Sequence, residues 1–294
     1  MSDADRYLIG VDIGGTFTDA VVVAPEGGIT VGKVSTTPED FSQGFFASIT
    51  AAAAALGLDE ATLWQRTERL AHGTTVGINA LVTGDVAPTA YVATKGHGDA
   101  IRAMGGGGRI LGASLEELLD YRLSSRAEPL VPRNRVVEVS ERLDRDGKVV
   151  VALTDEKLDE VVARIDALDV EAVAISFLWS FVNSSHEERA ARHLQAARPG
   201  LFLSCSHEIA PRIGEYPRSA STILNAQIGP LMTGYIERIA AGSRERGLQG
   251  DLLFAQSEGS LVPASEASRF PLRTLQSGPV AGVVGCARVG PTMS

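Results

Sequence analysis

The chain has 294 residues, of which 44% are hydrophobic and 21% are charged, and its formal net charge at pH 7 is -9. This length suits one large domain or two ordinary ones, with enough residues for a substantial core. Nucleic acid and anionic lipid both attract basic surfaces, so the acidic balance argues against either as a partner. We therefore expect a small-molecule substrate, no nucleic acid and no membrane.

The compartment is inferred from the first residues, the hydropathy and the cysteines. The opening stretch MSDADR lacks the apolar core of a signal peptide, and no apolar run approaches the length of a membrane span. Cys205 and Cys286 lie far apart and do not form a metal-type pair. These features predict a cytoplasmic protein with reduced thiols.

The first third of the chain reads as alternating strands and helices. Runs rich in Val and Ile indicate strands, and glycine or proline marks the connections between them. Such alternation predicts an α/β sheet. The expected elements are strands at 7–13, 17–24 and 29–35, a helix from an N-cap at Thr37 to Gly57, a short strand, a helix beginning near Thr74, and the strand "APTAYVAT".

The middle of the chain is less regular, and alternation then resumes. Four glycines, Gly105 to Gly108, predict a flexible loop, with anion binding as the weaker alternative. A hairpin is expected with its turn at Asp146-Gly147. The later elements are a helix at 155–168, a strand at 170–178, a helix capped by Ser185, the strand "LFLSCS", a helical stretch at 214–246 that Gly229-Pro230 can interrupt, the strand "DLLFAQS", and a helix opening at "SGPVAG".

The stretch "IGVDIGGTFTDAVVV", residues 9–23, interrupts a good core strand with polar residues and glycines. Gly14-Gly15 is a normal two-residue hairpin loop, and this is the simplest explanation. However, Asp12 sits inside the apolar strand, where an unpaired carboxylate is costly. Glycines also let backbone N–H groups approach a ligand. The set therefore also suits a phosphate held at the turn, with a carboxylate that holds Mg²⁺ through water.

Two common phosphate motifs are excluded for this stretch. No GxxxxGK[ST] sequence occurs, so it is not a Walker loop. The glycines join two strands rather than a strand and a helix, so it is not a dinucleotide fingerprint.

"DIGGTFTD" at 12–19 resembles the first phosphate loop of the actin-like ATPase superfamily. It is most similar to the version in the hydantoinase A / 5-oxoprolinase / acetone carboxylase family. "MGGGGR" and "LQSGPVAG" look more like the acetone and acetophenone carboxylase branch. Further blocks similar to the family follow in order: "HGTTVGINAL" at 72–81, "EPLVPRNRVVEVSERLDRDGKVV" at 128–150, "AVAISFLWSFVNSSHEERA" at 172–190, "EIAPRIGEYPRSASTILNAQIGPLM" at 208–232 and "LRTLQSGPVAGVVG" at 272–285.

The resemblance implies a fold, cofactors and site residues. The fold is an α/β actin-like ATPase (ribonuclease H-like) half-domain with an inserted α+β segment, covering 6–184, followed at 200–294 by the start of a second family domain. ATP and Mg²⁺ are the implied cofactors. Asp12, the Mg²⁺ residue, and His72 are the implied catalytic residues. The implied nucleotide contacts are Gly14, Gly15, Thr16, Thr18, Asp19, Thr74, Thr75, Ser277 and Gly278.

The resemblance also implies an activity. Family members use ATP to activate a cyclic amide for hydrolysis, or a ketone and bicarbonate for carboxylation. Actin-like ATPases bind nucleotide between two halves, each with one phosphate hairpin, and DIGGT at 12 is the only DxGGT here. We therefore expect this chain alone not to turn over ATP, and a second subunit or a C-terminal half to complete the cleft. A non-catalytic scaffold that keeps the fold is the alternative, and a sugar or acid kinase is a weaker one.

The histidines and Cys205 also have simpler interpretations. His72 can be a buried, hydrogen-bonded histidine beside a helix that Thr74 or Thr75 caps, or part of a site at that helix N-terminus. His186 and His193 lie seven residues apart and are interpreted as a solvated helix face rather than a metal site. His97 and His207 lack partners at ligand spacing. Cys205 sits in an apolar strand pattern and is expected in the core.

Overall fold

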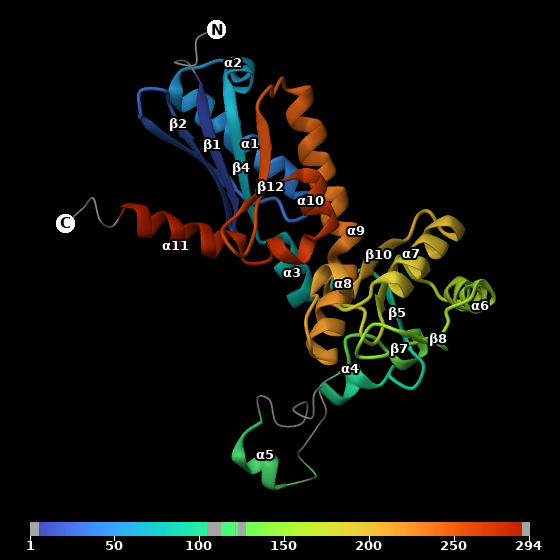
Figure 1. Cartoon of the computed structure of the whole chain (residues 1–294). Helices are drawn as coiled ribbons and strands as arrows, with labels where there is room; N and C mark the ends of the chain where they lie inside the picture. Colours follow the sequence, from blue (N-terminus) through green and yellow to red (C-terminus); the bar gives the residue numbers. More distant parts are fainter. Residues whose placement is uncertain (1–5, 105–112, 121, 123–127, 290–294) are drawn as a thin grey trace. The chain divides into compact units, whose positions relative to one another are not determined.

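The computed structural model describes residues 6–104, 113–120, 122 and 128–289, so the glycine run Gly105 to Gly108 lies outside the described part. The chain forms two compact units. Unit 1 combines Met1–Val86 with Leu231–Ser294, and unit 2 is the intervening segment Ala87–Pro230. Unit 2 is therefore an insertion in the sequence of unit 1 (Figure 1).

Unit 1 is built on a six-stranded mixed sheet of order β12-β11-β4-β1-β2-β3. The first three strands form an antiparallel meander, β4 and β11 continue the sheet in parallel from β1, and β12 closes the edge antiparallel to β11. The strands are β1 (Tyr7–Ile13), β2 (Phe17–Val23), β3 (Ile29–Ser35), β4 (Thr67–Thr74), β11 (Asp251–Ala255) and β12 (Leu261–Pro263).

The two faces of this sheet differ in how they are covered. Along β1 and β2 successive side chains alternate between buried and exposed or half-buried, as the two-residue period of a strand dictates. The buried face packs on helix α1 (Phe41–Leu56), which approaches so closely that a Cβ at Gly32 would overlap the helix backbone. The opposite face, which we call the open face, exposes Leu8, Val21, Ile29 and Val31.

The first helix begins later than the sequence predicted. Asp40, not Thr37, is the N-cap, because the Asp40 carboxylate accepts a hydrogen bond from the Ser42 backbone N–H at 3.0 Å. The Thr37 hydroxyl instead donates to the Asp40 carbonyl oxygen at 2.6 Å. Gly57 ends the helix in the left-handed conformation, as predicted. The other helices of unit 1 are α2 (Glu60–Gln65), α3 (Val76–Thr83), α10 (Ala264–Arg269), η4 (Pro271–Thr274) and α11 (Ser277–Val289).

Unit 2 is built on a four-stranded parallel sheet of order β10-β9-β5-β6. All residues of β5 and β9 are buried, as is typical of a parallel sheet covered on both faces. A small hairpin accompanies the sheet and turns at Gly147, as the sequence predicted. The strands are β5 (Thr89–Thr94), β6 (Val136–Val139), β9 (Ala172–Ser176), β10 (Phe202–Cys205) and the hairpin pair β7 (Arg142–Leu143) and β8 (Val149–Val151).

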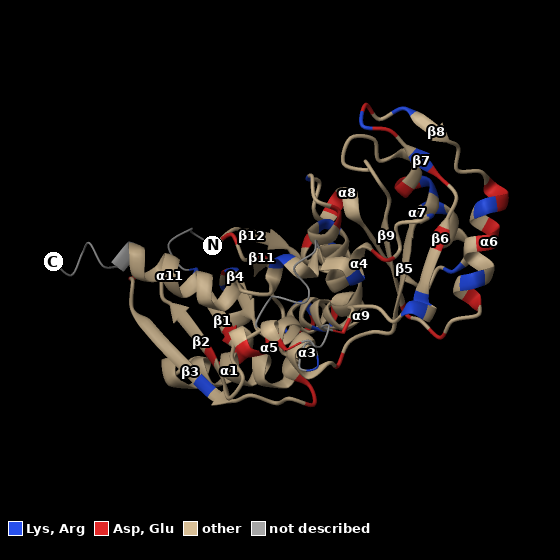
Figure 2. Ribbon diagram, turned by 90° about the horizontal axis from the view of Figure 1, so that it is seen from below, with Lys and Arg blue, Asp and Glu red and all other residues tan. Residues whose placement is uncertain are grey.

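Two layers of helices form the core of unit 2 with this sheet. One core cluster joins Val161 and Leu194 to the sheet, and another joins Ile223 and Ala226 to its other face. Figure 2 shows both acidic and basic residues along α6, as on a solvated helix. The helices are α4 (Ala100–Ala103), α5 (Leu115–Leu119), η3 (Arg133–Arg135), α6 (Asp155–Asp166), α7 (Ser185–Ala197), α8 (Ser206–Ile209) and α9 (Glu215–Glu245).

Helix α9 contributes to both units, since the boundary between them falls at Pro230. Pro230 lies inside the helix, which runs on as a single element of 31 residues. Among the described residues, no helix combines the length and the apolar character needed to cross a bilayer.

Candidate functional site

The loop between β1 and β2 is a tight hairpin turn. The Gly14 backbone N–H donates to the Phe17 carbonyl oxygen at 3.0 Å. A Cβ on Gly15 would meet no heavy atom within 4 Å, and this glycine has no positive φ angle. The fold itself therefore does not require glycine at this position. Its absence of a side chain leaves the backbone of the turn open to a ligand.

Asp12 and Asp19 lie opposite each other across the β1–β2 pair. The Asp19 carboxylate is bound by the Lys33 ammonium, at 2.8 Å and 3.0 Å from its two oxygens. The pKa of Asp12 is raised from its ordinary value, first by burial and then by the negative charge of Asp19. The Asp12 carboxylate has no hydrogen bond to another described residue, so a cation beside it would offset the charge of Asp19.

Two glycines keep side chains away from the Asp12 carboxylate. A Cβ on Gly73, at the end of β4, would lie 3.2 Å from Asp12 Oδ1, and one on Gly278, at the start of α11, would lie 3.1 Å from the same atom. A pocket of about 340 Å³ opens here between the sheet and α11. Its walls are formed by Gly10, Val11, Asp12, Asp19, Val21, Ala71, His72, Gly73, Ala255, Leu261, Gly278, Ala281 and Gly282.

The hydroxyl of Thr18 does not face this pocket. Thr18 is fully buried, and its Oγ1 lies 3.1 Å from Thr36 Oγ1. The Thr36 hydroxyl in turn donates to the Gly14 carbonyl oxygen at 2.8 Å. Thr18 therefore stabilises the hairpin through Thr36, on the face of the sheet that α1 covers. Thr16 is exposed at the turn, where a ligand can reach it.

The hydroxyls of Thr75 and Ser277 form hydrogen bonds with backbone groups rather than pointing into the pocket as free groups. The Ser277 hydroxyl accepts from the Thr74 backbone N–H at 3.1 Å and donates to the Thr74 carbonyl oxygen at 3.3 Å, which ties the start of α11 to β4. The Thr75 hydroxyl donates to the Ile13 carbonyl oxygen at 2.9 Å. Thr74, Thr75 and Ser277 do not line the pocket; their bonds join the elements that carry its lining residues.

His72 is one of the residues that line the pocket, but it is fully buried in β4 and its ring packs against Phe45 and Phe254. Its Nδ1 lies 3.1 Å from the Val11 carbonyl oxygen and its Nε2 lies 2.5 Å from the Tyr235 hydroxyl oxygen. Burial lowers the pKa of His72 to about 4. The catalytic role expected for His72 stays a prediction, and this geometry favours support of β1 over contact with a substrate.

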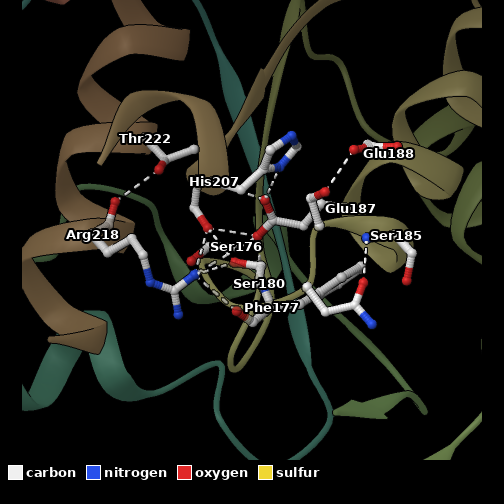
Figure 3. Close-up of polar contacts among 12 residues, drawn as sticks. Ser176, Phe177, Ser180, Ser185, Glu187, Glu188, His207, Arg218 and Thr222 are labelled. Carbon is white, nitrogen blue, oxygen red and sulfur yellow. Dashed lines mark hydrogen bonds and ion pairs between the residues drawn. The ribbon is translucent and has the colours of Figure 1, made fainter. Parts of the chain in front are cut away.

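A dense polar cluster occupies the carboxyl ends of the strands in unit 2 (Figure 3). Glu187 of α7 is fully buried and accepts hydrogen bonds from the Phe177 and His207 backbone N–H groups at 2.8 and 2.9 Å. It also accepts from the Ser206 hydroxyl at 2.5 Å, and its Oε2 lies 2.7 Å from His207 Nδ1. The buried Arg218 guanidinium lies 3.8 Å from Glu187 Oε1.

This cluster was not predicted, although Glu187 and Arg218 lie in two of the family-like blocks and His207 directly precedes the second. Ligand atoms of Glu187, Cys205 and His207 lie within 4.8 Å of one another, close enough to hold a metal ion. The expectation that His207 lacks ligand-type partners is therefore wrong in three dimensions. Glu187 is already saturated by donors and faces a guanidinium, so the arrangement favours a structural hub over a metal centre. Cys205 belongs to the core, as predicted.

His186 also differs from the prediction of a solvated helix face. It is buried, and its Nδ1 lies 2.7 Å from Glu141 Oε2, while the Thr94 hydroxyl donates to the other oxygen of the same carboxylate. His193 does lie at the surface and pairs with Asp159 at 2.8 Å. Glu141 precedes His186 by 45 residues, so no local pattern could reveal this pair.

Comparison with known proteins assigns the family. A family model described as the hydantoinase/oxoprolinase N-terminal region matches residues 8–197, and one described as hydantoinase/oxoprolinase matches residues 218–293. These matches and the compact units divide the chain differently, since unit 2 is an insertion. The linear division into 6–184 and 200–294 stays a prediction.

Similar proteins include caprolactamase subunit alpha from Pseudomonas jessenii, 32% identical over 93% of this chain and 38% of that protein. The acetophenone carboxylase gamma subunit from Aromatoleum aromaticum is 30% identical over 95% of this chain and 38% of that protein. This chain thus spans about two fifths of the length of these relatives.

Two solved structures are similar over nearly all of this chain. Nucleotide-free acetone carboxylase superposes with a TM-score of 0.89 at 25% identity, covering 98% of this chain and 41% of that one. The ATP-dependent caprolactamase from Pseudomonas jessenii superposes with a TM-score of 0.81 at 30% identity, covering 97% and 40%. The expected α/β fold is confirmed. By sequence and by fold, the chain belongs to the hydantoinase/oxoprolinase family.

Proposed function

We propose that this chain is the N-terminal part of an ATP-dependent enzyme that activates a carbonyl compound by phosphorylation. The substrate is a cyclic amide, activated for hydrolysis, or a ketone, activated together with bicarbonate for carboxylation. Both chemistries occur among the relatives by name, as a caprolactamase and as ketone carboxylases. A second subunit or a further segment supplies the other half of the nucleotide cleft.

The observation that carries the proposal is the environment of Asp12. Its carboxylate faces a pocket, has a raised pKa and lies beneath two glycines that leave it uncovered. The Asp19 carboxylate is paired with Lys33, whereas the Asp12 carboxylate has no donor among the described residues and is exposed, so it is open to a ligand that carries positive charge.

The described residues fit Mg²⁺ and a nucleotide phosphate. Asp12 supplies the oxygen ligand that Mg²⁺ prefers, directly or through water. The turn at Gly14, Gly15 and Thr16 offers uncovered main chain for phosphate oxygens. When bound, Mg²⁺ supplies positive charge that stabilises the phosphate in transfer.

The residues of the chain then act mainly by position. Asp12 would hold Mg²⁺ beside the hairpin, and the Ser277–Thr74 bonds hold the start of α11 at the pocket. In the transfer, the substrate carbonyl oxygen attacks the γ-phosphorus and ADP leaves. In the hydrolase case water then attacks the phosphorylated carbon, and the ring C–N bond breaks as the nitrogen takes a proton and leaves as an amine. A second water attacks the carbon of the resulting acyl phosphate, and phosphate leaves with the original carbonyl oxygen. Positioning and charge stabilisation account for most of the rate in such reactions.

The first test is calorimetric titration of the chain with Mg-ATP. We expect binding by the wild type and at least about tenfold weaker binding by Asp12→Asn, which removes the charge but keeps the shape. Asp251→Asn removes an exposed carboxylate from β11 of the same sheet and serves as the control. Equal affinity of the Asp12 and Asp251 variants would contradict the proposed metal role, and no binding by the wild type would favour a scaffold.

The substrate class is tested on the protein purified with its bound partners. A lactam labelled with ¹⁸O at the carbonyl should transfer the label to inorganic phosphate if the hydrolase case holds. A ketone with ¹³C-bicarbonate should give a labelled carboxylate if the carboxylase case holds. ATP consumption without either product would contradict carbonyl activation.

A further inference from the structure

Tyr235 is linked to the β1–β2 hairpin, which we call the phosphate hairpin, through the buried His72, and its hydroxyl also contacts the side chain of Thr74. Tyr235 lies in the part of α9 that belongs to unit 1 and is 1% exposed. Its hydroxyl contacts Nε2 of His72, which lies 163 residues earlier in the chain. The His72 ring is also packed edge-on against Phe45 and Phe254, with centroids 4.9 and 5.6 Å away. The ring is therefore held on every side.

The direction of each hydrogen bond follows from the partners. A carbonyl oxygen can only accept, so His72 Nδ1 carries the proton donated to Val11. Burial disfavours the imidazolium, so Nε2 is an acceptor and the Tyr235 hydroxyl is the donor. Burial also raises the pKa of Tyr235, which keeps this hydroxyl protonated. The Tyr235 hydroxyl therefore donates a hydrogen bond to His72, and His72 donates one to the Val11 carbonyl oxygen.

This series of hydrogen bonds ends at the carbonyl of Val11, directly before Asp12. The Val11 carbonyl belongs to the peptide group that joins Val11 to Asp12. Fixing the plane of that peptide group fixes the direction in which the Asp12 side chain leaves the strand. Val11 is opposite His72, and Asp12 opposite Gly73, in the parallel β1–β4 pair. The hydrogen bond thus links neighbouring strands at the height of the pocket.

We propose that Tyr235 is a positioning residue for the phosphate hairpin, acting through His72 to orient the Val11–Asp12 peptide group and the Asp12 carboxylate. This inference rests on the proposed function for its consequence, but the positioning itself can be measured without nucleotide. Neither Tyr235 nor its contact with His72 belongs to the phosphate-loop motif, so the sequence pattern alone gives no indication of it.

The tautomer of His72 is the first measurement, made on the wild type by ¹⁵N NMR of the imidazole. We expect a neutral ring with the proton on Nδ1 from pH 8 to pH 5.5. A proton on Nε2, or a ring that becomes charged near neutral pH, would overturn the proposal. This measurement stands even if the Tyr235 variants fold poorly.

The second measurement compares Tyr235→Phe with Tyr216→Phe, which removes a hydroxyl from the same helix at a half-buried position. Hydrogen exchange should accelerate in peptides covering 7–18 for Tyr235→Phe only, with the rest of unit 1 unchanged. The dissociation constant for Mg-ATP should rise about five- to tenfold, as expected for the loss of one buried hydrogen bond.

The outcomes separate the two proposals. Faster exchange confined to 7–18 supports positioning, even if the wild type binds no Mg-ATP and the proposed function fails. Unchanged exchange in that stretch, or exchange accelerated throughout unit 1, overturns positioning, because the hydroxyl would then do nothing or merely stabilise the fold. Faster exchange at 7–18 with unchanged Mg-ATP affinity would also overturn it, since the hairpin would not depend on the bond for its ligand.

Discussion

Acidification should destabilise unit 1 through His72. The pKa of this ring is lowered by burial to about 4 in the folded chain, against an ordinary value of 6.5. The unfolded chain therefore binds the proton more tightly, and the free energy of unfolding falls as the pH drops from 6.5 to 4. The shift corresponds to about 3 kcal/mol between pH 7 and pH 4, a large share of a typical domain stability.

The assay uses the placement of the two tryptophans. Trp64 is buried in unit 1, whereas Trp179 lies in unit 2, so a Trp179→Phe background reports urea unfolding of unit 1 alone. His72→Gln in this background keeps a neutral donor and acceptor at the same position but cannot be protonated. We expect its loss of stability between pH 7 and pH 4 to be smaller than that of the parent by about 3 kcal/mol. Equal losses in the two proteins would refute the reasoning.

Three further perturbations test other parts of the structure. Glu187→Gln should lower the stability of unit 2 by about 3 kcal/mol in urea unfolding, because a buried guanidinium loses its carboxylate; Glu188→Gln, on the exposed neighbour, should change it by less than about 0.5 kcal/mol. Gly73→Ala places a Cβ 3.2 Å from Asp12 Oδ1 and should weaken Mg-ATP binding about tenfold in calorimetry with little effect on thermal unfolding. The open face should bind a hydrophobic dye, and Val31→Lys should reduce that fluorescence; a signal no greater than that of an ordinary monomer would contradict the exposed apolar patch.

The strands and turns of unit 1 could be predicted because their determinants are local. The third strand was predicted at 29–35 and lies at Ile29–Ser35, and Gly57 ends the first helix as expected. Thr37 was a poorer prediction, because Thr-Pro and Asp40 both resemble helix starts, and only the side-chain bond from Asp40 to the Ser42 N–H decides between them.

The insertion could not be predicted from local pattern. Both units contain strands followed by helices, so the alternation continues across Val86 and Ala87 without a change of period. Helix α9 then crosses the second boundary as one continuous element, with Pro230 inside it. A boundary inside a helix leaves no linker composition to detect. The pairing of β4 with β11, 182 residues apart at Arg69 and Asp251, exists only in the fold.

The buried polar pairs could not be predicted from local pattern either, both in the candidate site and in unit 2. His72 meets Tyr235, and Glu141 meets His186, over separations of 163 and 45 residues. A sequence identifies each partner as a polar residue in an apolar context, which signals a bond but does not name the other member. His72 could be singled out for that reason, whereas Tyr235 could not.

The two-residue period of a strand could have predicted which hydroxyl of the DIGGTFTD stretch faces the pocket and which faces the helix layer. Asp19 and Thr18 are neighbours in β2, so their side chains must leave on opposite faces of the sheet. If Asp19 faces the pocket together with Asp12, Thr18 must face the helix layer, and there it is buried against Thr36. A threonine in that position holds the hairpin to the loop before α1. The groups that remain for a phosphate are then the main chain of the turn and the exposed Thr16. A hairpin that binds through its backbone depends on rigidity more than on side-chain chemistry, and this explains why so many of its hydroxyls bond to the protein itself.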